Sequence, residues 1–156
     1  MELAFDIKAW FAARDGSRQE FIRNIGWDDA VISPVSEDCA MRRYLRLVKP
    51  DGQKAILLES LPDDDPHSTP GHKLRDTIRI GSYLRTIDIH TPEIYEVDEA
   101  NGYLLIEDFG DYTFKNAFES GTASRHDLYD MATRVLVHLR ENADLSKISL
   151  PSYYDS

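Results

Sequence analysis

The chain has 156 residues, 42% of them hydrophobic and 29% charged, a balance typical of a folded globular domain rather than a disordered segment. Its formal net charge of -10 argues against a surface for nucleic acid or anionic membrane, because such surfaces need clustered Lys and Arg. The single cysteine, Cys39, excludes an internal disulfide. Glu2 and Asp6 stand where a signal peptide needs positive charge, so a cytoplasmic protein is predicted.

Two short helices are predicted in residues 1–30. Apolar side chains recur at mostly helical spacing after Glu2, and Gly16 is expected to end this first helix. Ser17 is expected to cap the second helix, because Glu20 follows three residues later in the pattern of a capping box.

Three extended runs follow the helical region. The run "AVISPV" predicts a strand at a sheet edge or a bend, because Pro34 cannot donate to a ladder. The runs "MRRYLRLVK" and "QKAILLES" are joined by Pro50-Asp51-Gly52, which predicts an antiparallel hairpin. The apolar middle of the third run predicts a strand that is buried on both faces.

The second half of the chain contains one more hairpin and three helices. An acidic loop, "LPDDDPHSTPG", precedes an amphipathic helix expected from His72 to about Asp88. Asn101-Gly102 predicts a turn between two strands within residues 92–110. Two helices are then expected at 113–119 and 124–141. The second has an apolar stripe of Leu128, Met131, Val135, Leu136 and Leu139.

This order predicts an α+β fold with a five-stranded antiparallel sheet and one helix inserted between its third and fourth strands. That arrangement is the small lobe of the protein-kinase-like fold. N-terminal helices would precede the lobe, and hinge helices would follow it.

Four segments carry a resemblance to a known family: "EDCAMRRY" at 37–44, "LPDDDP" at 61–66, "TPEIYEVD" at 91–98 and "LLIEDFGD" at 104–111. They resemble the aminoglycoside phosphotransferase family, and within it the bacterial anomeric N-acetylmuramate/N-acetylglucosamine kinases. The likeness implies a nucleotide-binding small lobe with a hinge at 31–110 and the start of a helical large lobe at 111–156. It also implies ATP and Mg2+ as cosubstrate and metal, with a sugar as substrate.

The tripeptide Asp108-Phe109-Gly110 has the letters of the kinase motif whose Asp holds magnesium. That motif must follow a catalytic loop with a His, an Asp and an Asn, and no such loop precedes it here. A hinge is therefore the preferred interpretation. Resemblance to kinases assigns the adenine contacts to the Glu107 C=O and the Phe109 N–H, with Ile106 as the back wall of the pocket.

A capped turn is the alternative interpretation of the same residues. Gly110 would then occupy a positive-φ position, and Asp111 would cap the helix that starts at Thr113. Asp111 can fill that position under either interpretation.

The resemblance also implies a phosphate-binding loop at Asp38, Cys39, Ala40 and Met41, although Glu37 stands where the family usually has Gly. Small residues in such a loop let backbone N–H groups approach an anion. Arg43 is in phase with the apolar residues of the second strand. Two roles for it stay open, a phosphate contact and an ion pair.

Two functions stay open at this point. The chain is expected to be the nucleotide-binding part of a sugar phosphotransferase that transfers the ATP γ-phosphate to a hydroxyl. Its catalytic residues and metal ligands would lie beyond Ser156, so this chain alone is expected to be inactive. The alternative is a non-catalytic binding or regulatory module, because Leu57 and Leu58 stand near the place of the strand-three Lys of kinases. Exposed hinge helices predict self-association.

Overall fold

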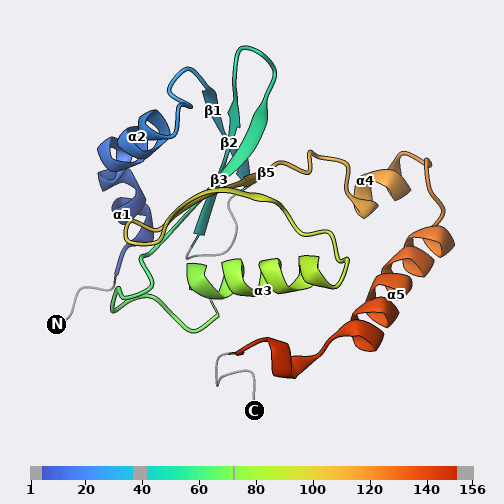
Figure 1. The fold of residues 1–156 in the computed structure, drawn as a ribbon. Helices are drawn as coiled ribbons and strands as arrows, with labels where there is room; N and C mark the ends of the chain where they lie inside the picture. Colours follow the sequence, from blue (N-terminus) through green and yellow to red (C-terminus); the bar gives the residue numbers. More distant parts are fainter. Residues whose placement is uncertain (1–4, 37–41, 72, 151–156) are drawn as a thin grey trace. The chain divides into compact units, whose positions relative to one another are not determined.

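The computed structural model describes residues 5–36, 42–71 and 73–150. Within these ranges the chain forms five α-helices and a five-stranded antiparallel sheet, so the predicted α+β class is confirmed (Figure 1). The helices are α1 (Ile7–Ala13), α2 (Asp15–Asn24), α3 (Leu74–Thr86), α4 (Phe114–Glu119) and α5 (Arg125–Asn142), followed by a 3-10 turn, η1 (Leu145–Lys147). The strands are β1 (Val31–Ser36), β2 (Arg42–Val48), β3 (Lys54–Ser60), β4 (Ile94–Asp98) and β5 (Tyr103–Glu107).

The strand order in the sheet is β1-β2-β3-β5-β4, and every neighbouring pair is antiparallel. Both predicted hairpins are present, β2–β3 around Gly52 and β4–β5 around Gly102. Each of these glycines has a positive φ, which an L side chain rarely adopts. The first strand lies at an edge, and its register shifts between Pro34 and Ser36, as the proline predicts.

Gly102 is also required for a close approach between two backbones. A Cβ at this position would lie 2.1 Å from the carbonyl oxygen of Ser60. The Ser60 N–H donates to the Gly102 C=O at 2.9 Å, so the contact continues the pairing of β3 beyond its ladder with β5. The β4–β5 turn therefore packs directly against the end of β3.

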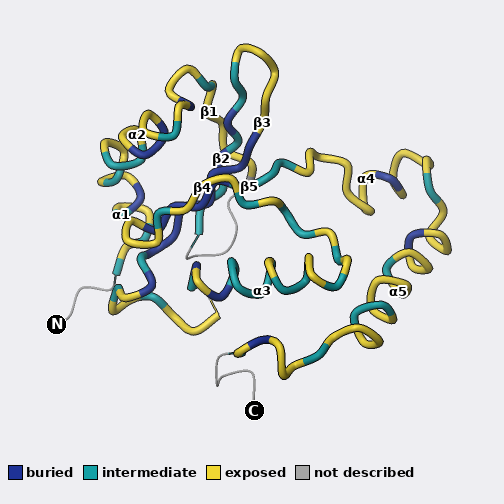
Figure 2. The backbone as a smooth tube through the Cα atoms, viewed as in Figure 1, coloured by how far each residue is buried: buried dark blue, intermediate teal, exposed yellow. Residues whose placement is uncertain are grey.

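One face of the sheet packs against α2 and Trp27. Alternate side chains of β2, β3 and β5 point to this face, as the period of a strand requires. The cluster consists of Phe21, Ile22, Trp27, Leu45, Leu47, Ala55, Leu57, Tyr103 and Leu105. Figure 2 shows the buried residues gathered along β3 and β5. The prediction that the third strand is buried on both faces is confirmed.

The opposite face of the sheet packs against the first turns of α3. Its buried cluster contains Leu58, Leu74 and Leu104, and four partly buried residues surround it: Tyr44, Ile78, Ile94 and Ile106. The buried carboxylate of Asp63 accepts from the Leu74 N–H at 2.6 Å and from the Arg75 N–H at 3.1 Å. The acidic loop thereby supplies acceptors to the first N–H groups of the helix.

The N-terminal helices depart from the prediction at their boundary. Gly16 does not end a helix, because α2 begins at Asp15 and continues through it. Ser17 is not the cap, since the cap position is Arg14 and the Ser17 Oγ accepts from the Tyr103 hydroxyl at 3.1 Å. The first helix instead begins after Asp6, whose side chain accepts from two backbone N–H groups.

The last two helices follow the predicted order with one corrected cap. Thr113 rather than Asp111 caps α4, because its hydroxyl accepts from the Asn116 N–H at 3.2 Å. Ser124 caps α5 in the same way through the Asp127 N–H.

The chain divides into two compact units. The first comprises residues up to Ile78 together with Glu93–Asp108, and the second comprises Arg79–Pro92 together with the residues from Phe109 onward. No helix in the described ranges is long and apolar enough to cross a membrane.

Candidate functional site

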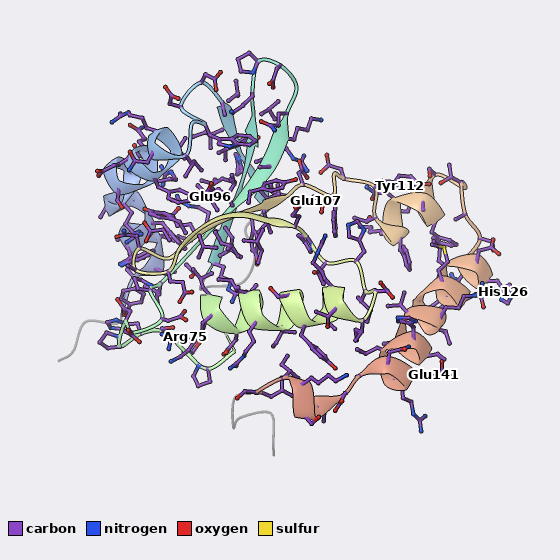
Figure 3. All side chains as sticks on the ribbon, viewed as in Figure 1. Arg75, Glu96, Glu107, Tyr112, His126 and Glu141 are labelled. Atoms are coloured by element: carbon purple, nitrogen blue, oxygen red, sulfur yellow. The ribbon has the colours of Figure 1, made fainter. Side chains whose placement is uncertain are left out.

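The end of β5 carries the residues that the sequence predicts for the back and the hinge of a nucleotide site. Ile106 lies on the α3 face of the sheet, paired with Ile56 of β3 and Ile94 of β4. Glu107 ends the strand, where Figure 3 labels it. Its N–H donates to the Glu93 C=O at 2.8 Å, and its carboxylate accepts from the Glu93 N–H at 3.1 Å. The backbone of β5 is therefore tied to the start of β4.

The carboxylate of Glu107 also acts on a nearby phenol. The pKa of Tyr95 is raised, first because its hydroxyl is partly removed from water, and then by the negative charges of Glu107 and Glu93. Two carboxylates, of Glu93 and Glu107, therefore act on this phenol at the edge of the sheet.

Asp108 pairs with Arg46 of β2 through both carboxylate oxygens. Arg46 Nε donates at 2.6 Å and Nη2 donates at 3.0 Å, and only 3% of the Asp108 side chain is exposed. This bidentate geometry is the strong form of an arginine–carboxylate contact. Asp108 thus serves as an anchor of the strand end. In the described residues no cluster of three His, Cys, Asp or Glu side chains could hold a metal ion.

Phe109 and Gly110 follow the strand in an exposed position. The Phe109 N–H makes no hydrogen bond with the described residues, and the ring lies 5.0 Å from the His90 ring between centroids. Gly110 has a φ of 75°, so the positive-φ part of the capped-turn interpretation is confirmed. The cap itself belongs to Thr113.

Arg43 lies on the opposite face of the sheet from Ile106, and the structure shows the ion-pair role. Its Nε donates to Glu59 Oε2 at 3.0 Å, Nη2 donates to the same oxygen, and the guanidinium stacks on the Phe11 ring at 4.7 Å. Alternation along β2 predicted that Arg43 shares a face with Leu45 and Leu47. It could not show that helical residues cover that face.

Glu59 is the centre of a buried ion cluster that joins the sheet to the N-terminal helices. Its side chain is fully buried, and besides Arg43 it lies 3.6 Å from Arg14 Nε and 3.5 Å from Arg18 Nη1. A carboxylate without such partners would not tolerate complete burial. The cluster accounts for an acidic residue inside an apolar strand.

The position expected for the strand-three lysine is apolar. Leu58 lies on the α3 face, almost fully buried against Leu74 and Leu104, whereas Leu57 lies on the other face. The predicted phosphate-loop residues Asp38, Cys39, Ala40 and Met41 lie outside the described residues.

Sequence reasoning missed Arg42, although the alternation of β2 contained the signal. Residues 42, 44 and 46 point to the face opposite Arg43, toward α3. The Arg42 Nη2 donates to the Thr77 Oγ1 of α3 at 3.0 Å.

Comparison with known proteins gives two relatives of the same kind. The chain is 27% identical over 131 residues to an N-acetylmuramate/N-acetylglucosamine kinase of Pseudomonas aeruginosa, which is 82% of this chain and 35% of that protein. It is 24% identical over 112 residues to a kinase of the same name from Pseudomonas putida, which is 70% of this chain and 31% of that protein. The chain thus spans about a third of the length of the curated relatives it matches. No family model matches it.

Proposed function

We propose that the unit containing the sheet is the nucleotide-binding lobe of a sugar phosphotransferase. The observation that carries the proposal is the arrangement β1-β2-β3-β5-β4 with α3 inserted between β3 and β4, in a chain similar to two sugar kinases over most of its length. The reaction of the whole protein would transfer the γ-phosphate of ATP to a hydroxyl of N-acetylmuramate or N-acetylglucosamine. We also propose that the whole protein belongs to the aminoglycoside phosphotransferase family.

The adenine would lie against the end of β5. Ile106 offers an apolar side chain on the α3 face, and the Glu107 C=O and the Phe109 N–H are the proposed acceptor and donor. Two observations support this assignment: the Asp108–Arg46 pair anchors the residue that follows β5, and the Phe109 N–H makes no hydrogen bond with the described residues. We leave Arg43 out of the site, because Glu59 engages its guanidinium.

The described side chains do not support a magnesium site in this part of the protein. Because no cluster of three His, Cys, Asp or Glu side chains among the described residues could hold a metal, none of these residues is proposed as a ligand of Mg2+. The residues described here would bind and orient the nucleotide, and in kinases of this type the metal ligands come from the large lobe.

A non-catalytic nucleotide-binding or regulatory module is the second candidate. The observation in its favour is Leu58, which fills the place of the strand-three lysine with a buried apolar side chain. The two candidates differ in whether a longer chain transfers phosphate.

The test combines binding with chemistry. Calorimetric titration of the purified chain with ATP and ADP should show binding. Incubation with ATP and N-acetylmuramate should show no phosphorylated sugar, because the catalytic groups are expected elsewhere. Phosphate transfer by this chain, free of contaminating kinase, would contradict the proposed division between the lobes. Absence of any nucleotide binding would contradict the proposal as a whole.

A further inference from the structure

Arg42 differs from the other arginines of β2 in having no carboxylate partner among the described residues. Arg43 pairs with Glu59, and Arg46 pairs with Asp108. Arg42 donates a single hydrogen bond, to the neutral hydroxyl of Thr77 at 3.0 Å. Its Nε is buried and makes no hydrogen bond with the described residues. A half-buried guanidinium is thus left with its charge uncompensated.

A half-buried guanidinium without an anionic partner lowers the stability of the fold. A guanidinium has five N–H donors, and a hydroxyl satisfies only one of them without neutralising the charge. The chain has 28 acidic residues against 18 basic ones, so acids were available for pairing, and the neighbouring arginines use them. An anionic ligand would supply both the missing acceptors and the missing charge. Phosphate oxygens match the planar fork of arginine particularly well.

The position of Arg42 agrees with a phosphate ligand. It is the first residue of β2, paired with Ser60 at the end of β3, and it points to the α3 face that also carries Ile106. In protein kinases a sheet lysine, held by a side chain of the helix that follows strand three, contacts the ATP phosphates. Here the lysine position is Leu58, whereas Arg42 lies on the same face and is held by Thr77 of that helix.

We propose that Arg42 contacts the phosphates of the bound nucleotide in place of the strand-three lysine, and that Thr77 is its positioning residue. The inference rests on the proposed nucleotide-binding function. It names the cation of that site and explains how a lobe without the usual lysine holds a polyphosphate. Leu58, buried under α3, is then a packing residue rather than a sign of lost binding.

The test measures binding of three probes by the purified chain: adenosine, ATP and inorganic tripolyphosphate. Arg42→Gln removes the charge, and Lys54→Gln is the matched control because it removes one charge from an exposed residue at the other end of β3. Circular dichroism and thermal unfolding establish that each variant is folded. The Nε–H resonance of Arg42, followed by NMR during tripolyphosphate titration, reports the contact directly.

We expect Arg42→Gln to weaken ATP and tripolyphosphate binding about 10- to 100-fold, as the loss of a charge-assisted hydrogen bond implies, with adenosine binding unchanged. Lys54→Gln should bind all three probes like the parent. Thr77→Val should lower ATP affinity, and Thr77→Ser, which keeps the hydroxyl, should restore it. A merely structural role for Thr77 would change unfolding without separating ATP from adenosine.

Other outcomes separate this inference from the proposed function. If the folded Arg42→Gln variant binds ATP like the parent, the role of Arg42 is overturned and nucleotide binding stands. If the parent binds tripolyphosphate through Arg42 but ATP no more tightly, the anion contact stands and the adenine site fails. If the parent binds none of the probes, both proposals are overturned.

Discussion

The guanidinium of Arg46 and the carboxylate of Asp108 form a bidentate pair across the α3 face of the sheet, with donor–acceptor distances of 2.6 and 3.0 Å. The two residues come from β2 and from the residue after β5, which are 62 positions apart in the chain. The pair explains the aspartate of "EDFG" as an anchor that fixes where the strand leaves the sheet. If Asp108 were a magnesium ligand, its carboxylate oxygens would have to face the metal instead of Arg46.

Breaking this pair from one side should destabilise the fold. Asp108→Asn removes the negative charge that accepts two hydrogen bonds from the mostly buried Arg46, and we expect a loss of about 2–4 kcal/mol in the free energy of unfolding. Urea denaturation measures it. Asp130→Asn is the matched control, since Asp130 pairs with Arg134 on the surface of α5 and should change stability by about 0.5 kcal/mol or less. Equal effects of the two changes would refute the anchoring role.

Gly102 should be far less tolerant of alanine than Gly52. Both glycines have a positive φ in a hairpin turn, but only at Gly102 does a Cβ meet backbone, at 2.1 Å from the Ser60 oxygen. Gly52→Ala should cost about 1 kcal/mol for the backbone conformation alone. Gly102→Ala should cost about 3 kcal/mol or more, because β3 and the turn must move apart. Thermal unfolding of the two variants measures this difference. Equal losses of stability would show that the contact at Gly102 is not tight.

The cap of α5 predicts a pH dependence. The hydrogen bond that the Ser124 hydroxyl donates to the Asp127 carboxylate, followed by a hydrogen bond from the Ser124 backbone N–H, lowers the pKa of the Asp127 carboxyl in the folded state. A lowered pKa means that this group adds stability above its unfolded pKa and loses that stability as the pH falls through the folded value. Acidification below about pH 4 should therefore weaken the start of α5.

Ser124→Ala tests this assignment. The Asp127 pKa, followed by NMR of the carboxyl carbon, should rise toward its ordinary value. Asp144 is the internal control, because its pKa is lowered by a separate hydrogen bond from Ser146. An Asp127 titration that is unchanged in the variant would show that Ser124 is not the cause.

The hairpins could be predicted from the sequence because their signals are local. Gly52 and Gly102 occupy positive-φ positions that few other residues adopt, and each lies in a short turn between two extended runs. The edge position of β1 followed from Pro34 for the same reason. These features need only neighbouring residues to be specified.

Features that depend on distant residues could not be predicted. The acceptor at the start of α3 is Asp63, eleven positions before Leu74. Gly16 is tolerated inside α2, where the local propensity rule predicted an end. The identity of the arginine facing α3 required knowledge of which helix covers which face. The alternation of side chains along β2 placed Arg42 and Arg43 on opposite faces of the sheet, but it could not show which of the two faces α3 covers.

Self-association should occur through the apolar surface of α5. Met131, Val135 and Leu136 are 54%, 53% and 65% exposed, and Leu128 alone of the predicted stripe is buried. An exposed apolar surface of this kind favours contact with another apolar surface, and a second copy of the chain can provide one in solution. Light scattering at high concentration should show a dimer, and Leu136→Glu should give a monomer with unchanged helix content. Thr133→Glu, elsewhere on the helix, is the control. A parent chain that is monomeric at high concentration would contradict this expectation.

The central claim is that nucleotide binds against the end of β5, and titration of the Ile106→Phe variant with ATP tests it most directly. Ile106 lies on the α3 face between Ile56 and Ile94, so a larger ring fills the proposed back wall while the strand still buries an apolar side chain. The overpacking should cost about 1–2 kcal/mol without unfolding the sheet. Val97→Phe, at an exposed position of β4, controls for adding a ring to the sheet.

We expect the parent chain and Val97→Phe to bind ATP with the same affinity, and Glu107→Gln to change it little, because the proposed contact of Glu107 is through its backbone. Ile106→Phe should lose detectable binding in calorimetric titration, with the parent's circular dichroism spectrum retained. Unchanged ATP affinity in a folded Ile106→Phe variant would place the nucleotide elsewhere and leave "LLIEDFGD" as an anchored strand end with a turn.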